Sequence, residues 1–144
     1  MGKEKEIGLQ YQKLVEYHLL KRGFVVNETL GDYSPYDLVI EKNGKMLRIQ
    51  VRSTHWRMGG SHRGYKLQCT DGRRKNILTK DRCDFIIAVA GKEDLIYILP
   101  CELLNQKTIY LHPDKANYRT RKFGRNQNEK MRWEGFLNAW NLLE

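Results

Sequence analysis

The sequence predicts an α/β domain with a mixed β-sheet flanked by helices. Helical and strand-like segments follow one another in the order α-β-β-β-loop-β-β-α-β-α. An Asn-Gly pair joins two of the strand-like segments, which is typical of a tight antiparallel hairpin. A chain of 144 residues is long enough to bury a core without disulfides and fits one compact domain.

The first predicted element is a helix from Ile7 to Arg22. Its apolar side chains recur near helical spacing, and Gly23 follows as a stop signal. Segment 24–30 then has the composition of a short strand. The turn-rich stretch 31–37 comes next, and Pro35 restrains the backbone just ahead of Asp37.

The clearest pair of strands covers 36–42 and 45–53, on either side of Asn43-Gly44. If the turn is centred on this pair, Asp37 lies opposite Gln50, to within a residue or two. Strand alternation places Gln50 and Arg52 on one face and the apolar residues between them on the other. An acidic oxygen, an amide oxygen and a cation are therefore expected to meet at the end of the hairpin far from the turn.

The rest of the chain is less regular. Segment 55–79 is rich in glycine and basic residues and is interpreted as a loop or ragged hairpin outside the core. Two strands follow, "CDFIIAVAG" and "DLIYILP", and then a short helix "CELLNQ" and a strand "KTIYLHP". A basic link, 117–130, leads to a tail whose apolar residues recur at helical intervals. These are Met131, Phe136, Leu137, Trp140 and Leu143.

The amino-acid composition of the chain restricts the classes of function that it can have. There are 26 Lys and Arg residues against 17 Asp and Glu, a net charge of +9, which favours polyanionic partners such as nucleic acid. No apolar run approaches the roughly 20 residues needed to span a bilayer, and the first residues lack the apolar region of a signal peptide. The three cysteines have no CxxC spacing, which argues against disulfides or a closed zinc site and favours a reducing cytoplasm. The spacing of His55 and His62 does not favour zinc either.

The hairpin residues fit phosphodiester hydrolysis. A carboxylate and further oxygen ligands hold Mg²⁺ against a scissile phosphate, while a cation stabilises the developing charge. The alternative is that Asp37 is a turn or capping residue and that Gln50 and Arg52 face solvent. The closeness of the three residues to a loop rich in Arg and Lys favours the catalytic interpretation.

The pattern "PYD", 12 intervening residues and "QVR" resembles the signature of the PD-(D/E)XK nuclease superfamily. Glutamine at the second position makes it most similar to the bacterial group I intron-encoded homing endonucleases, which carry a PD-(D/Q)XK-like site. The helix "GLQYQKLVEYHLLKRGFVV" and the segment "CDFIIAVAGKEDLIYILPCELL" resemble the flanking elements of that family. The resemblance implies a restriction-endonuclease-like core in a single domain, 1–144, with a C-terminal helical extension from about 127.

The resemblance also implies the site residues. The catalytic set would be Gln12, Asp37, Gln50 and Arg52, and the metal ligands would be Asp37, Gln50 and Val51, with Mg²⁺ as cofactor and Mn²⁺ as a substitute. Two positions depart from the family, because Gln12 stands where a glutamate is usual and Arg52 where a lysine is usual. Glu16, one turn after Gln12, is an alternative if the helix register is shifted. The expected form is therefore a nuclease with impaired chemistry, either naturally or by alteration.

Double-stranded DNA is the expected partner. Arginine can hydrogen-bond guanine and glutamine can hydrogen-bond adenine in the major groove. The alternative is a solvated basic loop. The candidate DNA-binding residues are Thr54, His55, Trp56, Arg57, His62, Arg63, Tyr65, Lys66, Gln68, Arg73, Arg74, Lys75, Arg119, Arg121 and Lys122.

Cutting both strands requires two active sites, so at least a homodimer is expected, and the resemblance implies a homotetramer acting on DNA in the bacterial cytoplasm. The C-terminal apolar stripe fits either the subunit interface or the core. Two other functions remain open, a Holliday-junction resolvase or similar structure-selective nuclease and a sequence-specific DNA-binding protein that no longer cuts. Preference for a linear duplex or for a four-way junction would separate the nuclease types.

Overall fold

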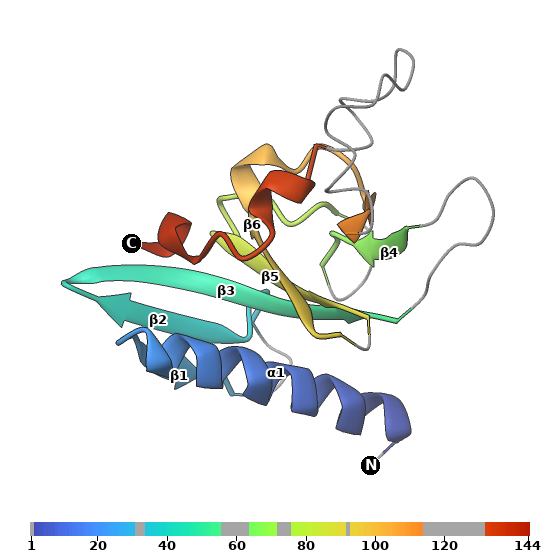
Figure 1. Ribbon diagram of the computed structural model, residues 1–144. Coiled ribbons are helices and arrows are strands. Elements are labelled where there is room, and N and C mark those ends of the chain that lie inside the picture. Colours follow the sequence, from blue (N-terminus) through green and yellow to red (C-terminus); the bar gives the residue numbers. More distant parts are fainter. Residues whose placement is uncertain (1, 31–33, 56–63, 72–75, 92, 114–131) are drawn as a thin grey trace.

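The structure is a computed structural model and describes residues 2–30, 34–55, 64–71, 76–91, 93–113 and 132–144. Its centre is a five-stranded sheet in the order β1-β2-β3-β5-β6, in which β3 and β5 are parallel and the other neighbours are antiparallel. The predicted α/β architecture with a mixed sheet is confirmed (Figure 1). The strands are β1 (Val25–Glu28), β2 (Leu38–Lys42), β3 (Lys45–Thr54), β5 (Phe85–Ala90) and β6 (Leu95–Pro100). Within the described residues, no helix is long and apolar enough to cross a membrane.

The predicted hairpin forms with the predicted register. Asn43 and Gly44 have φ angles of 53° and 81°, which only Asn, Asp and Gly adopt readily in a two-residue turn. The pairs run from Lys42 opposite Lys45 to Leu38 opposite Ile49. The turn chemistry therefore determines which residues of β2 and β3 meet at the far end.

One face of the sheet packs against the helix α1 (Lys3–Lys21). Val15 and Leu19 of the helix are fully buried against Leu47 and Ile49 of β3. The helix begins four residues before the predicted start at Ile7, because the charged residues at its beginning favour helix without showing an apolar period. Gly23, at φ 85°, ends it as predicted.

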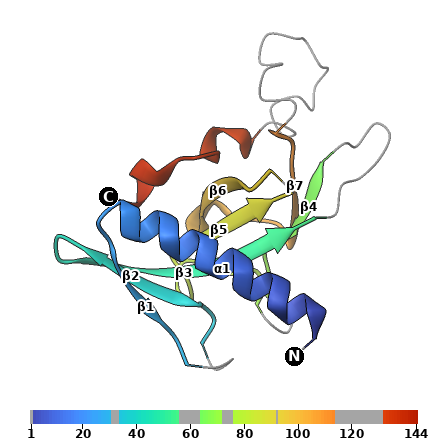
Figure 2. The same ribbon diagram turned by 60° about the horizontal axis from the view of Figure 1, so that its bottom comes forward.

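The opposite face is covered by segments far apart in sequence. A separate two-stranded antiparallel sheet is formed by β4 (Tyr65–Gln68) and β7 (Thr108–Leu111), and the short 3-10 helix η2 (Cys101–Leu103) follows β6. Figure 2 shows β4 and β7 side by side beyond the ends of β3 and β5. The core under this sheet contains the three cysteines, which are buried as the prediction of ordinary apolar residues requires.

The prediction that 55–79 lies outside the core is wrong for its described part. Leu67, Cys69 and Leu78 are essentially fully buried, and Thr70 bridges Ile77. Residues 65–69 alternate between apolar and polar as in a strand, but the glycines and charges on either side favoured a loop. Only pairing with β7, some forty residues later, buries them.

The C-terminal tail also differs from the prediction. Its described part, 132–144, is two 3-10 helices, η4 (Glu134–Phe136) and η5 (Trp140–Leu143), instead of one amphipathic helix. Leu137 bridges Tyr97 of β6, and the Asn138 N–H donates to the Ile96 carbonyl. Asn138 has a φ of 55°, so the chain turns onto the edge of the sheet at the point where a helix would have continued.

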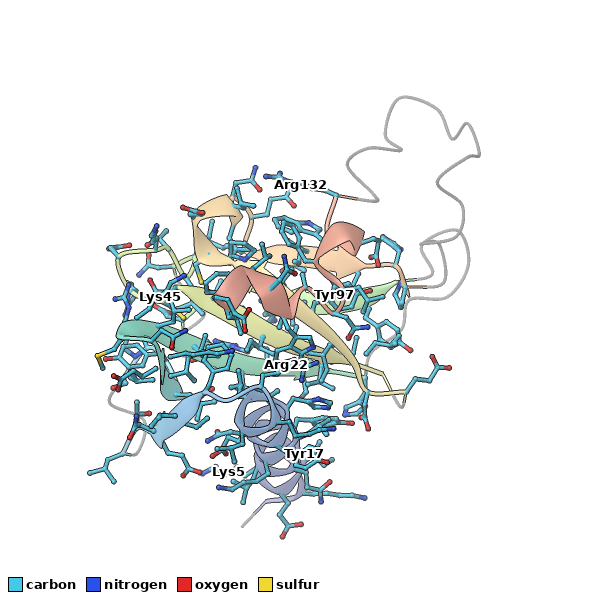
Figure 3. The ribbon with its side chains drawn as sticks, turned by 60° about the vertical axis from the view of Figure 1, so that its left-hand side comes forward. Lys5, Tyr17, Arg22, Lys45, Tyr97 and Arg132 are labelled. Atoms are coloured by element: carbon cyan, nitrogen blue, oxygen red, sulfur yellow. The ribbon has the colours of Figure 1, made fainter. Side chains whose placement is uncertain are left out.

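The tail is part of the core. Trp133, Trp140 and Leu143 are buried, and the Arg22 guanidinium lies 4.1 Å from the centre of the Trp140 ring. Figure 3 shows Arg22 between the end of α1 and this tail. The apolar residues that fitted either an interface or the core therefore pack within the chain, where the structure describes them.

Candidate active site at the end of the hairpin

The candidate site lies where β2 begins and β3 continues beyond it, paired only with β5 among the described strands. Leu38, the first residue of β2, pairs with Ile49, whereas β3 runs on to Thr54. The Asp37 N–H donates to the Ile49 carbonyl at 2.8 Å, and the Asp37 Oδ2 accepts the Val51 N–H at 2.9 Å. Asp37 thus bonds the main chain on both sides of Gln50, which confirms the predicted register at this end of the hairpin.

Local contacts hold the backbone of Asp37 in place. Pro35 restricts the chain before it, and Tyr36 packs against the core beneath the sheet. The Thr29 N–H donates to the Asp37 carbonyl at 3.0 Å, and the Thr29 hydroxyl donates to the Tyr36 carbonyl, also at 3.0 Å. The main chain that carries the carboxylate is therefore held on both sides, as expected for a group that must hold a ligand in fixed geometry.

Val51 is placed to contribute its main chain. In a strand, the N–H and C=O of one residue point to the same neighbour. Because the Val51 N–H points to Asp37, the Val51 carbonyl is directed to the same edge of β3, beside the carboxylate. The half-buried Gln50 lies between them and extends its side chain toward the sheet face opposite α1.

Arg52 lies on the same face as Gln50, one pair further along β3. Its Nη2 donates to the Thr70 carbonyl at 2.5 Å, so the guanidinium supports the segment after β4. The structure thus gives Arg52 a structural bond that the sequence did not indicate.

Gln12 approaches from the helix on the other face. It is half-buried on α1 between two anchored neighbours. The Tyr11 ring lies 5.1 Å from the His55 ring, just beyond β3, and Lys13 pairs with Glu28 at the end of β1. Glu28 is opposite Leu38, next to Asp37. These contacts align the turn carrying Gln12 with the site end of the sheet, although Gln12 belongs to a different layer from the Gln50 and Arg52 side chains.

Glu16, the alternative to Gln12, is engaged elsewhere. Its side chain is 13% exposed, and its Oε2 lies 3.4 Å from the Lys13 ammonium, which also pairs with Glu28. Burial raises the pKa of Glu16, and a hydrogen bond with Glu28 raises it further. The pKa of Glu28 is lowered, chiefly by its bond with Lys13. Glu16 therefore connects α1 to β1. These contacts direct its side chain to Lys13 and Glu28 and not to Asp37.

The variant Glu16→Gln is expected to melt at a higher temperature than the parent at pH 7. Since the pKa of Glu16 is raised in the folded state, its stabilising effect is complete below the ordinary pKa and is lost as the pH rises through the folded value. The advantage of the variant should therefore shrink at pH 4. Thermal melting at the two pH values measures this, with Glu6→Gln on the same helix as the exposed control. A variant less stable than the parent at pH 7 would contradict this reasoning.

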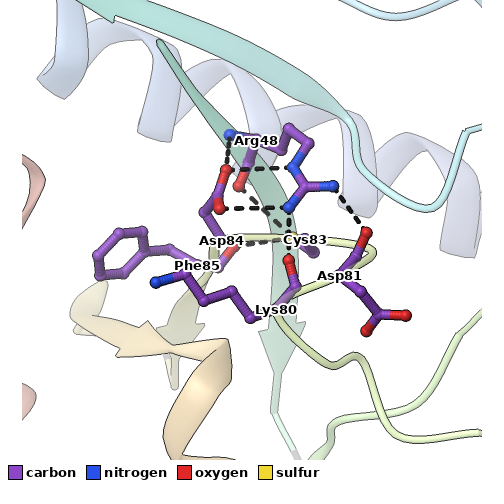
Figure 4. A network of polar contacts seen from close by, with 6 residues as sticks. All are labelled: Arg48, Lys80, Asp81, Cys83, Asp84 and Phe85. Carbon is purple, nitrogen blue, oxygen red and sulfur yellow. Dashed lines mark hydrogen bonds and ion pairs between the residues drawn. The ribbon is translucent and has the colours of Figure 1, made fainter. Parts of the chain in front are cut away.

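Arg48 shares the strand face of Gln50 but serves the fold. Its guanidinium bonds both carboxylate oxygens of Asp84, at 3.1 and 3.3 Å, and the carbonyls of Lys80 and Asp81, at 2.5 and 2.9 Å (Figure 4). Burial pushes the pKa of Asp84 upward, but the bonds and charge of Arg48 hold it below its usual value. This network ties β3 to the turn before β5 and so fixes the strand on which the candidate site depends.

The described candidate DNA-binding residues divide into two kinds. Thr54 is buried, and its hydroxyl donates to the Lys66 carbonyl at 2.7 Å, while Tyr65 packs against the core. His55 is exposed, and Lys66 and Gln68 are half-buried. The remaining candidates lie outside the described residues. They are Trp56, Arg57, His62, Arg63, Arg73, Arg74, Lys75, Arg119, Arg121 and Lys122.

The donors at the site fit a hard cation by type. A carboxylate, an amide oxygen and a carbonyl are oxygen ligands of the kind that Mg²⁺ and Mn²⁺ prefer. Their negative charge is low, because Asp37 is the only acid among the three. In the described part of the chain, no group of three or more His, Cys, Asp or Glu side chains is placed to hold a metal. The proposed ligands therefore have the donor atoms that Mg²⁺ prefers, but their total negative charge is low.

Comparison with known proteins adds independent evidence. A family model described as PD-(D/E)XK endonuclease matches residues 3–131. The solved structure of a bacterial homing endonuclease, I-Ssp6803I, is similar with a TM-score of 0.75 and 28% identity, over 99% of this chain and 93% of that one. Hjc, a Holliday junction resolvase from Archaeoglobus fulgidus, has a similar fold, with a TM-score of 0.51 and 14% identity over 77% of this chain and 88% of its own. No curated protein matches the chain.

Proposed function

The chain belongs to the PD-(D/E)XK endonuclease family, and on this premise we propose that it is a metal-dependent, site-specific endonuclease of double-stranded DNA, of the homing type. The observation that carries the proposal is the Asp37 carboxylate, held by the Val51 N–H at 2.9 Å on the edge of β3 that β2 leaves open. If Asp37 were only a solvated turn residue, it would not need the Val51 bond or the Thr29 contacts. It would not need a strand carbonyl beside its carboxylate either. The similarity to a homing endonuclease over nearly the whole chain supports the finer assignment.

Each residue has a proposed role. Asp37, the Gln50 side-chain oxygen and the Val51 carbonyl would hold Mg²⁺ or Mn²⁺. The bound cation would supply positive charge beside the scissile phosphate. Arg52 would add a second positive charge, but a guanidinium stays protonated and cannot take a proton from the attacking water. Gln12 would orient groups by hydrogen bonding without adding the negative charge of a glutamate.

Two departures from the family explain why we propose weakened chemistry. With Gln12 in place of glutamate, Asp37 is the single acid of the proposed set, and a low ligand charge reduces affinity for a divalent cation. Arg52 donates a hydrogen bond to the Thr70 carbonyl, which engages its guanidinium in the fold. A lysine side chain is shorter and would not need to make this bond. These features also favour a second candidate, a sequence-specific DNA-binding protein that does not cut.

Double-strand cleavage also implies an oligomer. Two cuts require two sites, so we expect the whole chain, 1–144, to act as one nuclease domain in a homodimer or a homotetramer. The net charge of +9 supports binding to a polyanion in the cytoplasm.

The test is cleavage of a randomised duplex library in Mg²⁺ and in Mn²⁺ by four proteins, namely the parent, Gln12→Glu, Arg52→Lys and the double variant. Restoring one ligand charge and one titratable amine is expected to raise cleavage at a defined sequence, most in the double variant. Arg132→Lys is the matched control, since Arg132 is an exposed arginine that also donates to a main-chain carbonyl, that of Leu103. Sequencing of the cut ends gives the site.

The outcomes separate the candidates. Cleavage at one linear sequence supports the homing type, and cleavage confined to an added four-way junction indicates a structure-selective nuclease instead. If none of the four proteins cuts either substrate while the parent still binds one duplex sequence at about 0.15 M salt, the DNA-binding protein is the correct account.

A further inference from the structure

The sheet formed by β4 and β7 presents two chemically different faces. Its register pairs Lys66 with Tyr110 and Gln68 with Thr108. The alternate residues Leu67, Ile109 and Leu111 are buried in the core. Because side chains alternate along a strand, the four polar residues share the outward face, which we call the ribbon face.

Packing does not account for the composition of the ribbon face. The buried residues of β4 and β7 already hold the ribbon to the core. Tyr110 nevertheless exposes 40% of its surface and lies directly across from Lys66 in the register. An amide, a hydroxyl and a phenol beside a lysine are hydrogen-bonding groups that recognise base edges and phosphates.

The ribbon is fixed at the site end of the central sheet. The Thr54 hydroxyl, two residues after Arg52, donates to the Lys66 carbonyl at 2.7 Å. Tyr65 lies so close to Gly91, just after β5, that a Cβ there would come within 2.4 Å of the Tyr65 hydroxyl oxygen. The Cys69 N–H extends the ladder to the Lys107 carbonyl at 2.8 Å. The ribbon lies beyond the C-terminal end of β3 (Figure 2), so a duplex held at Asp37 would reach it by extending toward that end of the strand.

We propose that the ribbon face enters the major groove of duplex DNA and reads bases beside the cleaved phosphate, with Gln68, Thr108 and Tyr110 as specificity-determining residues. The major groove admits a two-stranded ribbon, and its negative potential complements Lys66 and the net charge of +9. Gln68 is suited to adenine, through N6 and N7, and Thr108 to either a donor or an acceptor. This inference rests on the proposed function, since it requires that the chain bind duplex DNA.

The experiment is selection of bound duplexes from a randomised library by the full chain, without divalent metal so that nothing is cut. The parent, Gln68→Ala, Gln68→Glu and Tyr110→Ala are compared at about 0.15 M salt. Tyr17→Ala is the matched control, since Tyr17 is an exposed tyrosine on the outer side of α1 (Figure 3). Binding of the parent's selected sequence is then titrated with each variant.

Gln68→Ala is expected to lose the preference at one or two adjacent base pairs, with discrimination there falling roughly 10- to 100-fold, while the rest of the selected sequence is unchanged. Gln68→Glu should select cytosine at the affected position, because a carboxylate accepts from the cytosine N4 amine. Tyr110→Ala should weaken the selected duplex by about tenfold, and Tyr17→Ala should match the parent.

Unchanged selected sequences and affinities in all the ribbon variants would overturn the inference and leave the proposed function standing. A parent that binds no duplex would overturn both. Since Gln68→Glu predicts a changed base and not a loss, destabilisation by the substitution cannot imitate the expected result.

Discussion

Asp37→Asn is expected to reduce metal-dependent DNA cleavage by roughly 10³-fold, which corresponds to about 4 kcal/mol of transition-state stabilisation. Asparagine keeps the shape of the side chain and an oxygen that can accept the Val51 N–H, so the end of the hairpin should remain intact. The substitution removes the one negative charge in the proposed ligand set. The substitution is made in the faster of two proteins, the parent or the double variant Gln12→Glu, Arg52→Lys. The cleavage rate is then measured with and without Asp37→Asn.

The control for charge is Asp81→Asn. Asp81 is an exposed acid in the turn before β5, and its carboxylate accepts a bond from the Thr79 hydroxyl. Removing that charge should leave the cleavage rate within about twofold of that of the starting protein. This result would show that the change in net charge does not cause the loss of cleavage in Asp37→Asn. If Asp37→Asn cut DNA as fast as the protein it was made in, the hairpin would not be the active site.

Glu134→Ala is expected to lower the free energy of unfolding by roughly 3–5 kcal/mol. Glu134 is 3% exposed, and its carboxylate accepts two bonds, from the Tyr97 hydroxyl at 2.7 Å and from the His112 N–H at 2.5 Å. Alanine removes an acceptor from two buried donors at once and leaves a cavity. Burial raises the pKa of Tyr97, and the Glu134 carboxylate raises it further, which is consistent with a hydroxyl that remains a donor at all working pH values.

Urea unfolding of the parent, Glu134→Ala and Glu134→Gln measures this effect. Glutamine keeps an oxygen for the His112 main-chain N–H, and its amide N–H can donate to the Tyr97 hydroxyl oxygen, so it should lose much less stability than alanine. Glu102→Ala is the matched control, because Glu102 also lies in the first turn of a 3-10 helix but is exposed and pairs with Lys80 at the surface. Equal losses in the alanine and glutamine variants would show that the two hydrogen bonds are not what Glu134 contributes.

Features that depend on neighbouring residues were predictable from the sequence. Asn43-Gly44 determined the turn, the turn determined the register of β2 and β3, and the register brought Asp37 to Gln50. The helical period ended correctly at Gly23, and the two apolar strands before Pro100 formed as expected. The family resemblance is confirmed by the match over residues 3–131, because the spacing of these same local elements carries it.

The tertiary structure decided the features that depend on distant pairing. The sequence could not show that Leu67 would be buried, since its strand exists only through β7, nor that the tail would bend at Asn138 onto the edge of β6. It could not show that Arg48, on the same strand face as Gln50 and Arg52, would bond Asp84. Nor did the tyrosine at 110 stand out until the register placed it across from Lys66. Turns and periods are encoded within a few residues, whereas burial and hydrogen-bond partners come from segments that meet only when the chain has folded.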